Sequence, residues 1–207
     1  MSDITTVILA AGNSTRFKAS KSKLVYPLCG LPIVSHIFNI AKKISGKNIL
    51  IVSNEKNKEE LKLILNTPKL VVQKKQKGTA DAIEQVKKYV KSKNILILFG
   101  DTPLVEVKDI RKLVSKFKKS KAKASLIAFN TSEPHGYGRL LLNNNYVEEI
   151  IEQINLKPEQ KKINLCNSGI LIANTKPIIV APAMNTKMWV NQAVQRLSLI
   201  HNSEPTR

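Results

Sequence analysis

Short apolar runs alternate with longer segments of helical periodicity between residues 7 and 130. The runs are rich in Val, Ile and Leu and are bounded by small or polar residues, which predicts buried strands. They span residues 7–9, 48–53, 69–73, 94–99 and 124–130. The segments between them repeat apolar residues every three or four positions, which predicts helices. These segments span residues 32–44, 55–65, 78–90 and 109–118.

This alternation predicts an α/β protein with a Rossmann-like, mainly parallel sheet and helices on both faces. Ligands bind beyond the carboxyl ends of the strands in such sheets. The loops after the first, third and fourth strands carry Arg16, Gln73 and Asp101. We therefore expect these three side chains to converge on one crevice.

The alternation of strands and helices ends after residue 130, where apolar stretches follow one another without predicted helices between them. Residues 137–142, 146–151 and 169–173 are predicted strands. We expect them to form an additional strand layer over the crevice.

The chain has 207 residues, of which 43% are hydrophobic, and this predicts one globular domain. No stretch is long and apolar enough to span a bilayer, and the N-terminus lacks the pattern of a signal peptide, so we expect no membrane partner and a cytoplasmic location. Cys29 and Cys166 are far apart and in no C-x-x-C arrangement. This argues against a structural zinc site or a disulfide framework.

The formal net charge of +19 raises the possibility of a polyanionic partner such as nucleic acid. The basic residues are mostly lysines spread over predicted helix faces, with few aromatic residues among them for base stacking. We therefore predict solvated lysine-rich faces and no specific nucleic-acid site. Salt-dependent DNA binding would favour the alternative.

The first candidate for chemistry is the turn after the first predicted strand. Small side chains at Ala10, Ala11 and Gly12, after Leu9, let the backbone approach a ligand, and its N–H groups can cradle a phosphate. Arg16 and Lys23 add positive charge beside it. Neither G-x-x-x-x-G-K-[ST] nor G-x-G-x-x-G is present, so an ordinary strand-to-helix loop is the competing interpretation.

Two further candidates follow the third and fourth strands. The amide of Gln73 can pair with a uracil edge through one donor and one acceptor. Gly78 and Thr79 open a helix whose first N–H groups suit an anionic or carbonyl ligand, although a simple N-cap has the same pattern. Asp101 follows a buried strand and suits Mg²⁺, although a turn cap explains it equally well on its own.

Segments L-A-A-G-N-S-T-R-F at residues 9–17 and G-D-T-P-L at residues 100–104 resemble the sugar-1-phosphate nucleotidyltransferases. The resemblance covers about residues 5–175. It is greatest to the uridylyltransferase domain of the bacterial bifunctional N-acetylglucosamine-1-phosphate uridylyltransferases, a family whose fold is of the nucleotide-diphospho-sugar transferase type. Phe99 stands where this family usually has Tyr.

The resemblance implies transfer of UMP from UTP to N-acetylglucosamine 1-phosphate, giving UDP-N-acetylglucosamine, a precursor of peptidoglycan and lipopolysaccharide, and pyrophosphate. It implies Mg²⁺ as cofactor, in-line attack and no protein nucleophile. The implied nucleotide-binding residues are Leu9, Ala10, Ala11, Gly12, Gln73, Gly78 and Thr79, the catalytic residues Arg16 and Lys23, and the metal ligand Asp101. The implied sugar-binding residues are Gly138, Glu152 and Asn167; without the family, Gly138 is a hairpin residue and Glu152 part of a solvated charge run.

Other functions stay open. They are a thymidylyl or cytidylyl transferase, a nucleotide-binding remnant without turnover, and a flavoprotein. The flavoprotein alternative depends on residues 177–196 alone, which resemble a fragment of the phosphopantothenoylcysteine decarboxylases.

We predict an incomplete, C-terminally truncated nucleotidyltransferase domain over residues 1–175 and a foreign or chimeric tail over residues 176–207. The family's later Asn, which shares the metal with the residue matching Asp101, has no counterpart in the sequence. Residues 197–207 resemble translated adapter sequence. The sequence does not fix the oligomeric state.

Overall fold

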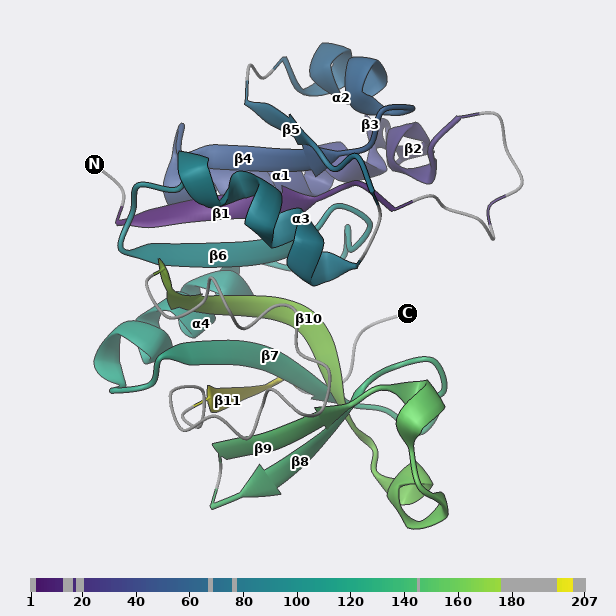
Figure 1. The fold of residues 1–207 in the computed structure, drawn as a ribbon, viewed down its shortest axis with the longest axis vertical. Helices are drawn as coiled ribbons and strands as arrows, with labels where there is room; N and C mark the ends of the chain where they lie inside the picture. The colour runs from purple at the N-terminus through teal and green to yellow at the C-terminus, as the bar shows by residue number, and fades with distance from the viewer. Residues whose placement is uncertain are drawn as a thin grey trace.

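The computed structural model describes residues 3–12, 17, 21–66, 69–75, 78–144, 146–175 and 197–202. A nine-stranded sheet dominates this part of the chain, in the order β5-β4-β1-β6-β10-β7-β11-β9-β8 (Figure 1). The strands are β1 (Ile4–Leu9), β4 (Ile49–Ser53), β5 (Leu70–Val72), β6 (Asn94–Phe99), β7 (Ala124–Asn130), β8 (Arg139–Asn143), β9 (Tyr146–Ile151), β10 (Leu165–Asn174) and β11 (Leu197–Asn202). A separate two-stranded hairpin pairs β2 (Pro27–Leu28) with β3 (Leu31–Pro32).

Helices cover both faces of the sheet, as predicted. The α-helices are α1 (Ile33–Ser45), α2 (Lys58–Leu65), α3 (Thr79–Val86) and α4 (Val107–Lys119). The short 3₁₀ turns are η1 (Lys23–Val25), η2 (Lys87–Tyr89), η3 (Gln153–Asn155) and η4 (Pro158–Lys162). Figure 1 shows α3 crossing the face of the sheet that is nearer the viewer, with α1 and α4 behind it.

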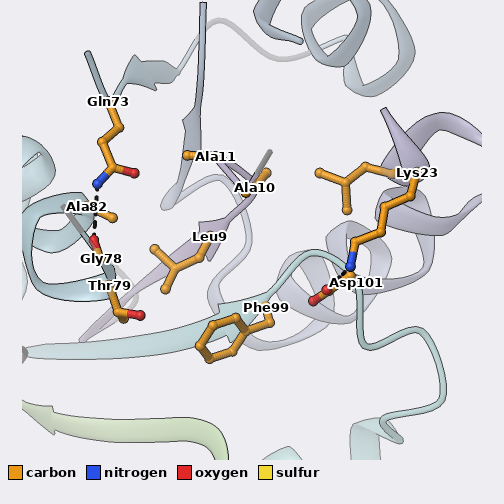
Figure 2. A pocket seen from close by; sticks show the side chains of 12 residues that line it. Leu9, Ala10, Ala11, Lys23, Gln73, Gly78, Thr79, Ala82, Phe99 and Asp101 are labelled. Carbon is orange, nitrogen blue, oxygen red and sulfur yellow. Dashed lines mark hydrogen bonds and ion pairs between the residues drawn. The ribbon is translucent and has the colours of Figure 1, made fainter. Parts of the chain in front are cut away.

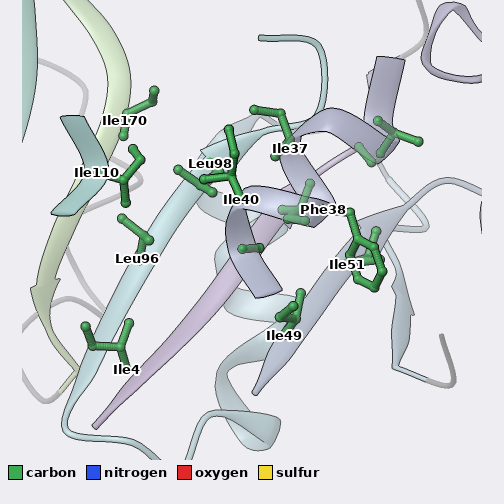
Figure 3. Packing of buried hydrophobic residues seen from close by; sticks show 14 of the residues in the cluster. Ile4, Ile37, Phe38, Ile40, Ile49, Ile51, Leu96, Leu98, Ile110 and Ile170 are labelled. Atoms are coloured by element: carbon green, nitrogen blue, oxygen red, sulfur yellow. The ribbon is translucent and has the colours of Figure 1, made fainter. Parts of the chain in front are cut away.

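The two faces separate cleanly in β1 because successive side chains of a strand point to opposite sides. Ile4 and Ile8 pack in one apolar cluster with α1, α2 and α4 (Figure 3). Val7 packs in a second cluster, with Ala82 and Ile83 of α3. A strand buried on both faces is apolar throughout, and this is why the sequence shows a continuous run here and not an alternation.

The first four strands of the chain's main sheet are parallel: β1 lies between β4 and β6, and β5 extends beyond β4. The second half differs, because β10 runs antiparallel to both β6 and β7. The predicted α/β class with a mainly parallel, Rossmann-like arrangement is confirmed.

The prediction of a separate strand layer is wrong. β10 lies within the main sheet, and the β8–β9 hairpin pairs with the same sheet. The reason lies in β10 itself, whose residues Cys166, Ile170, Ile172 and Ala173 are fully or almost fully buried. A strand with that much apolar surface gains more from an interior position than from a layer open to water.

Helix α2 begins three residues later than predicted. Asn54 and Asn57 accept hydrogen bonds from each other's backbone N–H groups, at 2.9 Å and 3.0 Å, and close a turn before Lys58. Asparagine competes with helix formation in this way because its short side chain can bond the local backbone.

The predicted tail lies mostly outside the described residues, since residues 176–196 and 203–207 fall there. The backbone of β11 is described, and it runs parallel to β7. The foreign origin of residues 176–207 and the resemblance of residues 177–196 to flavoproteins stay predictions. No helix within the described ranges has the length and apolar character needed to cross a bilayer.

Candidate functional site

A pocket of about 280 Å³ opens where β1 and β6 end (Figure 2). Its walls come from four separate segments: the turn after β1, η1, the stretch from β5 to α3, and the end of β6. The lining includes the sequence-predicted residues Leu9, Ala10, Ala11, Gly12, Lys23, Gln73, Gly78, Thr79 and Asp101. Leu24, Ala82 and Phe99 complete it. The predicted convergence of loops at the carboxyl ends of parallel strands is thus observed for Gln73 and Asp101.

Arg16, the first predicted catalytic residue, lies outside the described residues. Its place relative to the pocket therefore stays a prediction.

The turn after β1 is tied to its neighbours through the backbone. Ala10 N–H donates to the carbonyl of Val52 at 2.8 Å, and Gly100 N–H donates to the carbonyl of Leu9 at 2.9 Å. Ala10 and Ala11 are buried. A larger side chain at either position would have to displace core atoms, so small residues are required here for packing as well as for ligand approach.

Two buried asparagines that the sequence analysis did not select hold this turn. Asn57 Nδ2 donates to the carbonyl of Ala10 at 2.8 Å, and Asn54 Nδ2 donates to the carbonyl of Ala11 at 3.0 Å. With both carbonyls occupied by Asn side chains, the peptide planes of the turn are fixed. An Asn-x-x-Asn pair directly after a buried strand was the available sequence signal.

Gln73 continues β5 into the pocket, with its backbone N–H bonded to the carbonyl of Ser53 at 2.8 Å. Its side chain is only 4% exposed. Nε2 donates to the carbonyl of Gly78 at 3.0 Å and to Oδ2 of Asp81 at 2.7 Å. Both amide hydrogens are therefore used inside the protein, and Figure 2 shows the carbonyl oxygen on the side of Ala11. For a ligand, the side chain offers an acceptor and not the donor–acceptor pair that the sequence suggested.

Lys23 and Asp101 form an ion pair across the pocket. The Lys23 ammonium donates to Oδ2 of Asp101 at 2.6 Å, and each side chain is a little over one-third exposed (Figure 2). They are the charged side chains among the described residues that line the pocket. The pocket therefore presents one cation and one anion that are both open to solvent and able to exchange partners.

Asp101 is the described carboxylate that suits a metal at this pocket. Mg²⁺ usually takes one or two protein carboxylates, keeps several waters and fills its shell with substrate phosphates. A carboxylate that is a little over one-third exposed, beside a pocket of about 280 Å³, fits that pattern. Within the described ranges there is no group of three or more His, Cys, Asp or Glu side chains that could enclose a metal without a substrate.

The three predicted sugar-binding residues form a second group outside the pocket lining. Asn167 N–H donates to the carbonyl of Gly138 at 2.9 Å. A Cβ at Gly138 would lie 3.5 Å from both carboxylate oxygens of Glu152. Asn167 Oδ1 accepts from the N–H of Gly169 at 2.9 Å. Strand pairing thus brings Gly138, Glu152 and Asn167 together, although they are far apart in sequence.

Phe99 connects the two groups. It lines the pocket, and its ring lies so close to Gly169 that a Cβ there would overlap with Cε2 of the ring. Gly169 also has a φ of +79°, a conformation that favours glycine. The irregular stretch of β10 that carries Asn167 is therefore packed directly against the pocket wall.

Arg139 lies buried behind the second group, with only 2% of its surface exposed. Its guanidinium donates to the carbonyl of Tyr137 through Nη1 and to Oε1 of Gln153 through Nη2, the latter at 3.0 Å. It also faces Cys166, its partner in the β8–β10 pairing. Burial raises the pKa of the Cys166 thiol, and the positive charge of Arg139 opposes that shift. No pattern in the sequence predicted this buried cation.

A parallel sheet with a small-residue turn after its first strand, and a pocket at the strand ends, defines the class of α/β nucleotide-binding proteins. Residues 6–162 match the MobA-like NTP transferase domain, and the chain belongs to that family.

Curated relatives are similar over most of the chain. The chain is 39% identical over 192 residues to the bifunctional protein GlmU of Buchnera aphidicola subsp. Schizaphis graminum, an alignment that covers 92% of the chain and 40% of that protein. It is 36% identical over 206 residues to the bifunctional protein GlmU of Campylobacter fetus subsp. fetus, covering 94% of the chain and 46% of that protein. The chain thus spans less than half the length of these relatives.

Among solved structures, the chain resembles a putative glucose-1-phosphate thymidylyltransferase from Bacillus anthracis, crystallised with a sucrose. The TM-score is 0.80 at 20% identity, with 98% of this chain and 87% of the other covered. At this level of identity the likeness establishes the fold alone.

Proposed function

We propose that the chain is a nucleotidyltransferase that moves UMP from UTP to N-acetylglucosamine 1-phosphate, giving UDP-N-acetylglucosamine and pyrophosphate. The similarity to the bifunctional GlmU proteins and the family match support this proposal. The observation that carries it is the pocket that gathers the turn after β1, the Gln73 carbonyl and the Lys23–Asp101 pair.

The proposed reaction needs no covalent intermediate on the protein. An oxygen of the sugar phosphate attacks the α-phosphorus of UTP, the bond from that phosphorus to the bridging oxygen breaks, and pyrophosphate leaves with the bonding electrons. Catalysis then consists of alignment and of neutralising the charge on the phosphates. The backbone N–H groups of the turn at Ala11 and Gly12 orient the phosphates, and Lys23 and Arg16 supply positive charge.

Mg²⁺ belongs to the same proposal, with Asp101 as the protein ligand. When bound, the ion would neutralise phosphate charge and help to orient the triphosphate. At the other end, we propose that Gly138, Glu152 and Asn167 take the sugar, with Gly138 leaving room for close approach and the two polar side chains bonding hydroxyl or acetamido groups. Their contact with one another and the position of Phe99 support this arrangement.

Release of pyrophosphate tests the function. The purified chain is incubated with Mg²⁺ and a panel of nucleoside triphosphates, each paired with several sugar 1-phosphates. We expect the highest kcat/KM with UTP and N-acetylglucosamine 1-phosphate. A different best pair would overturn the substrate assignment, and nucleotide binding without pyrophosphate from any pair would favour a binding remnant.

The cytoplasmic location expected from the sequence is part of the proposal, and fractionation of cells that produce the chain tests it. The absence of specific nucleic-acid and membrane partners stays a prediction, for which DNA and vesicle binding at physiological salt are the measurements.

A further inference from the structure

Asp81, a residue of the first turn of α3, holds the Gln73 amide in one orientation. Its Oδ2 accepts from Gln73 Nε2 at 2.7 Å, while Oδ1 accepts a longer bond of 3.4 Å from Gln85 Nε2. The second hydrogen of Gln73 goes to the carbonyl of Gly78. Asp81 does not line the pocket itself.

The opposite orientation of the amide is excluded by these neighbours. Turning the Gln73 side chain by half a rotation would set its carbonyl oxygen against a carboxylate and a backbone carbonyl, both of which only accept hydrogen bonds. The NH₂ group would then face the pocket and lose both of its hydrogen bonds, which is costly because the Gln73 side chain is only 4% exposed. The oxygen is thus fixed on the pocket side, as Figure 2 shows.

A fixed acceptor discriminates between pyrimidine bases. Uracil and thymine carry an N3–H group that can donate to the Gln73 oxygen. Cytosine has an unprotonated N3 at the same place, and two acceptors would then face each other without a hydrogen. An amide that was free to turn would tolerate all three bases, because it could present either group.

We propose that Asp81 is a specificity-determining positioning residue, which selects UTP and dTTP over CTP by fixing the orientation of Gln73. This inference rests on the proposed function, in that the pocket must take the base of a nucleoside triphosphate. It adds to that function the residue that excludes cytosine without touching the base.

Asp81→Asn tests the inference, because an Asn side chain can present either an oxygen or an NH₂ group to Gln73. The matched control is Asp109→Asn, the same change in the first turn of another helix, α4. Binding of UTP, dTTP and CTP is measured by calorimetry with Mg²⁺, and kcat/KM by pyrophosphate release. We expect the preference for UTP over CTP to fall about tenfold in Asp81→Asn, the effect of one mispaired hydrogen bond, and to stay unchanged in Asp109→Asn.

The outcomes separate the inference from the function. Equal losses for UTP and CTP in Asp81→Asn, or a wild-type chain that binds both equally, would overturn the role of Asp81 and leave the transferase proposal standing. A wild-type chain that binds no nucleoside triphosphate would overturn both.

A measurement on the protein without nucleotide covers the case in which Asp81→Asn folds poorly. In wild type, we expect NMR to show the two side-chain N–H groups of Gln73 protected from hydrogen exchange. Gln85→Leu, which removes the second bond to Asp81, should leave that protection and the UTP preference in place. Rapid exchange of the Gln73 side chain in the folded wild-type protein would contradict the fixed amide.

Discussion

The parallel and antiparallel halves of the sheet present their polar side chains in different ways. In the parallel half, the groups at the pocket bond each other: Gln73 to Asp81, Lys23 to Asp101, and Asn57 to the carbonyl of Ala10. In the antiparallel half, Asn167 bonds Gly138 through the backbone at 2.9 Å, and no side-chain bond among the described residues links Gly138, Glu152 and Asn167. Each half keeps one buried polar atom without a partner among the described residues, Ser53 Oγ in the parallel half and Arg139 Nε in the antiparallel half.

The pocket side chains of the parallel half are thus held by direct side-chain bonds, whereas Gly138 and Asn167 of the antiparallel half are joined through the backbone. Side chains fixed by several partners lose little freedom when a ligand binds, so they favour affinity and selectivity. The antiparallel half depends instead on register, with an irregularity in β10 between Asn167 and Leu171. Variants in one half, or at the contact between the two halves, can test this difference.

The largest effect is expected from the ion pair in the parallel half. Lys23→Ala and Asp101→Asn should each reduce the rate of pyrophosphate release by about a hundredfold or more, because each removes a charge to which we assign a role in transition-state stabilisation or metal binding. Steady-state kinetics with UTP and the sugar phosphate measure this.

Lys108→Ala is the control for these two variants, because Lys108 forms an exposed pair with Glu106 away from the pocket. It should retain wild-type kinetics. Activity in Asp101→Asn equal to that of the control would contradict the role of Asp101.

A stability effect comes next, at the contact between the halves. Gly169→Ala places a methyl group into the ring of Phe99 in a backbone conformation with φ of +79°. Gly46 has a φ of +58° with open space around it, so Gly46→Ala has the backbone strain without the clash. We expect Gly169→Ala to lower the free energy of unfolding by about 1–3 kcal/mol more than Gly46→Ala, as judged by urea denaturation. Equal losses of unfolding free energy in the two variants would mean that the Phe99 ring moves aside at little cost.

A smaller loss is expected from the turn after β1. Asn57→Ala leaves the carbonyl of Ala10 and the N–H of Asn54 without their partners, and the free energy of unfolding should fall by about 1–3 kcal/mol. When the denaturation is repeated with UTP present, the ligand should stabilise Asn57→Ala less than it stabilises the wild type, because the turn is no longer fixed and binds UTP more weakly. Asn94→Ala removes an exposed bond of 3.3 Å and is the control. An Asn57→Ala protein as stable as this control would rule out the anchoring role.

The smallest effect is a difference in chemical reactivity between the two cysteines. Cys29 is exposed and Cys166 is buried. The thiolate is the reactive form, and a raised pKa leaves less of it at any given pH, so Cys166 should react more slowly across the range where thiols begin to ionise. Mass spectrometry after iodoacetamide treatment at pH 8 should find Cys29 modified first. Early modification of Cys166 would reveal that the antiparallel half opens readily.

The parallel half could be predicted from the sequence because its candidate site follows from local rules. Buried parallel strands appear as apolar runs, and the residues after them meet at one edge. Gln73 and Asp101 were found in this way. The orientation of the Gln73 amide could not be predicted in this way. It depends on Asp81, which lies eight residues further along the chain on α3, and the apolar pattern does not specify how that helix is rotated about its axis.

The antiparallel half could be predicted only in part. Its strands were predicted, but their position in the main sheet was not. The apolar pattern of a strand does not show which other strands it pairs with. Gly138, Glu152 and Asn167 were proposed from the family resemblance, and neither spacing nor composition pointed to buried Arg139. Residues that strand register brings together leave no periodic signal in the chain.

Lys23 and Asp101 cancel each other's charge as long as they face one another at 2.6 Å. A divalent cation bound at Asp101, as proposed above, would release the Lys23 ammonium, which could then bind an anion. The metal and the polyphosphate should consequently bind cooperatively, so that the affinity for each is higher when the other is bound. Calorimetric titration of the nucleotide with and without Mg²⁺, in wild type and in Lys23→Ala, would measure that cooperativity.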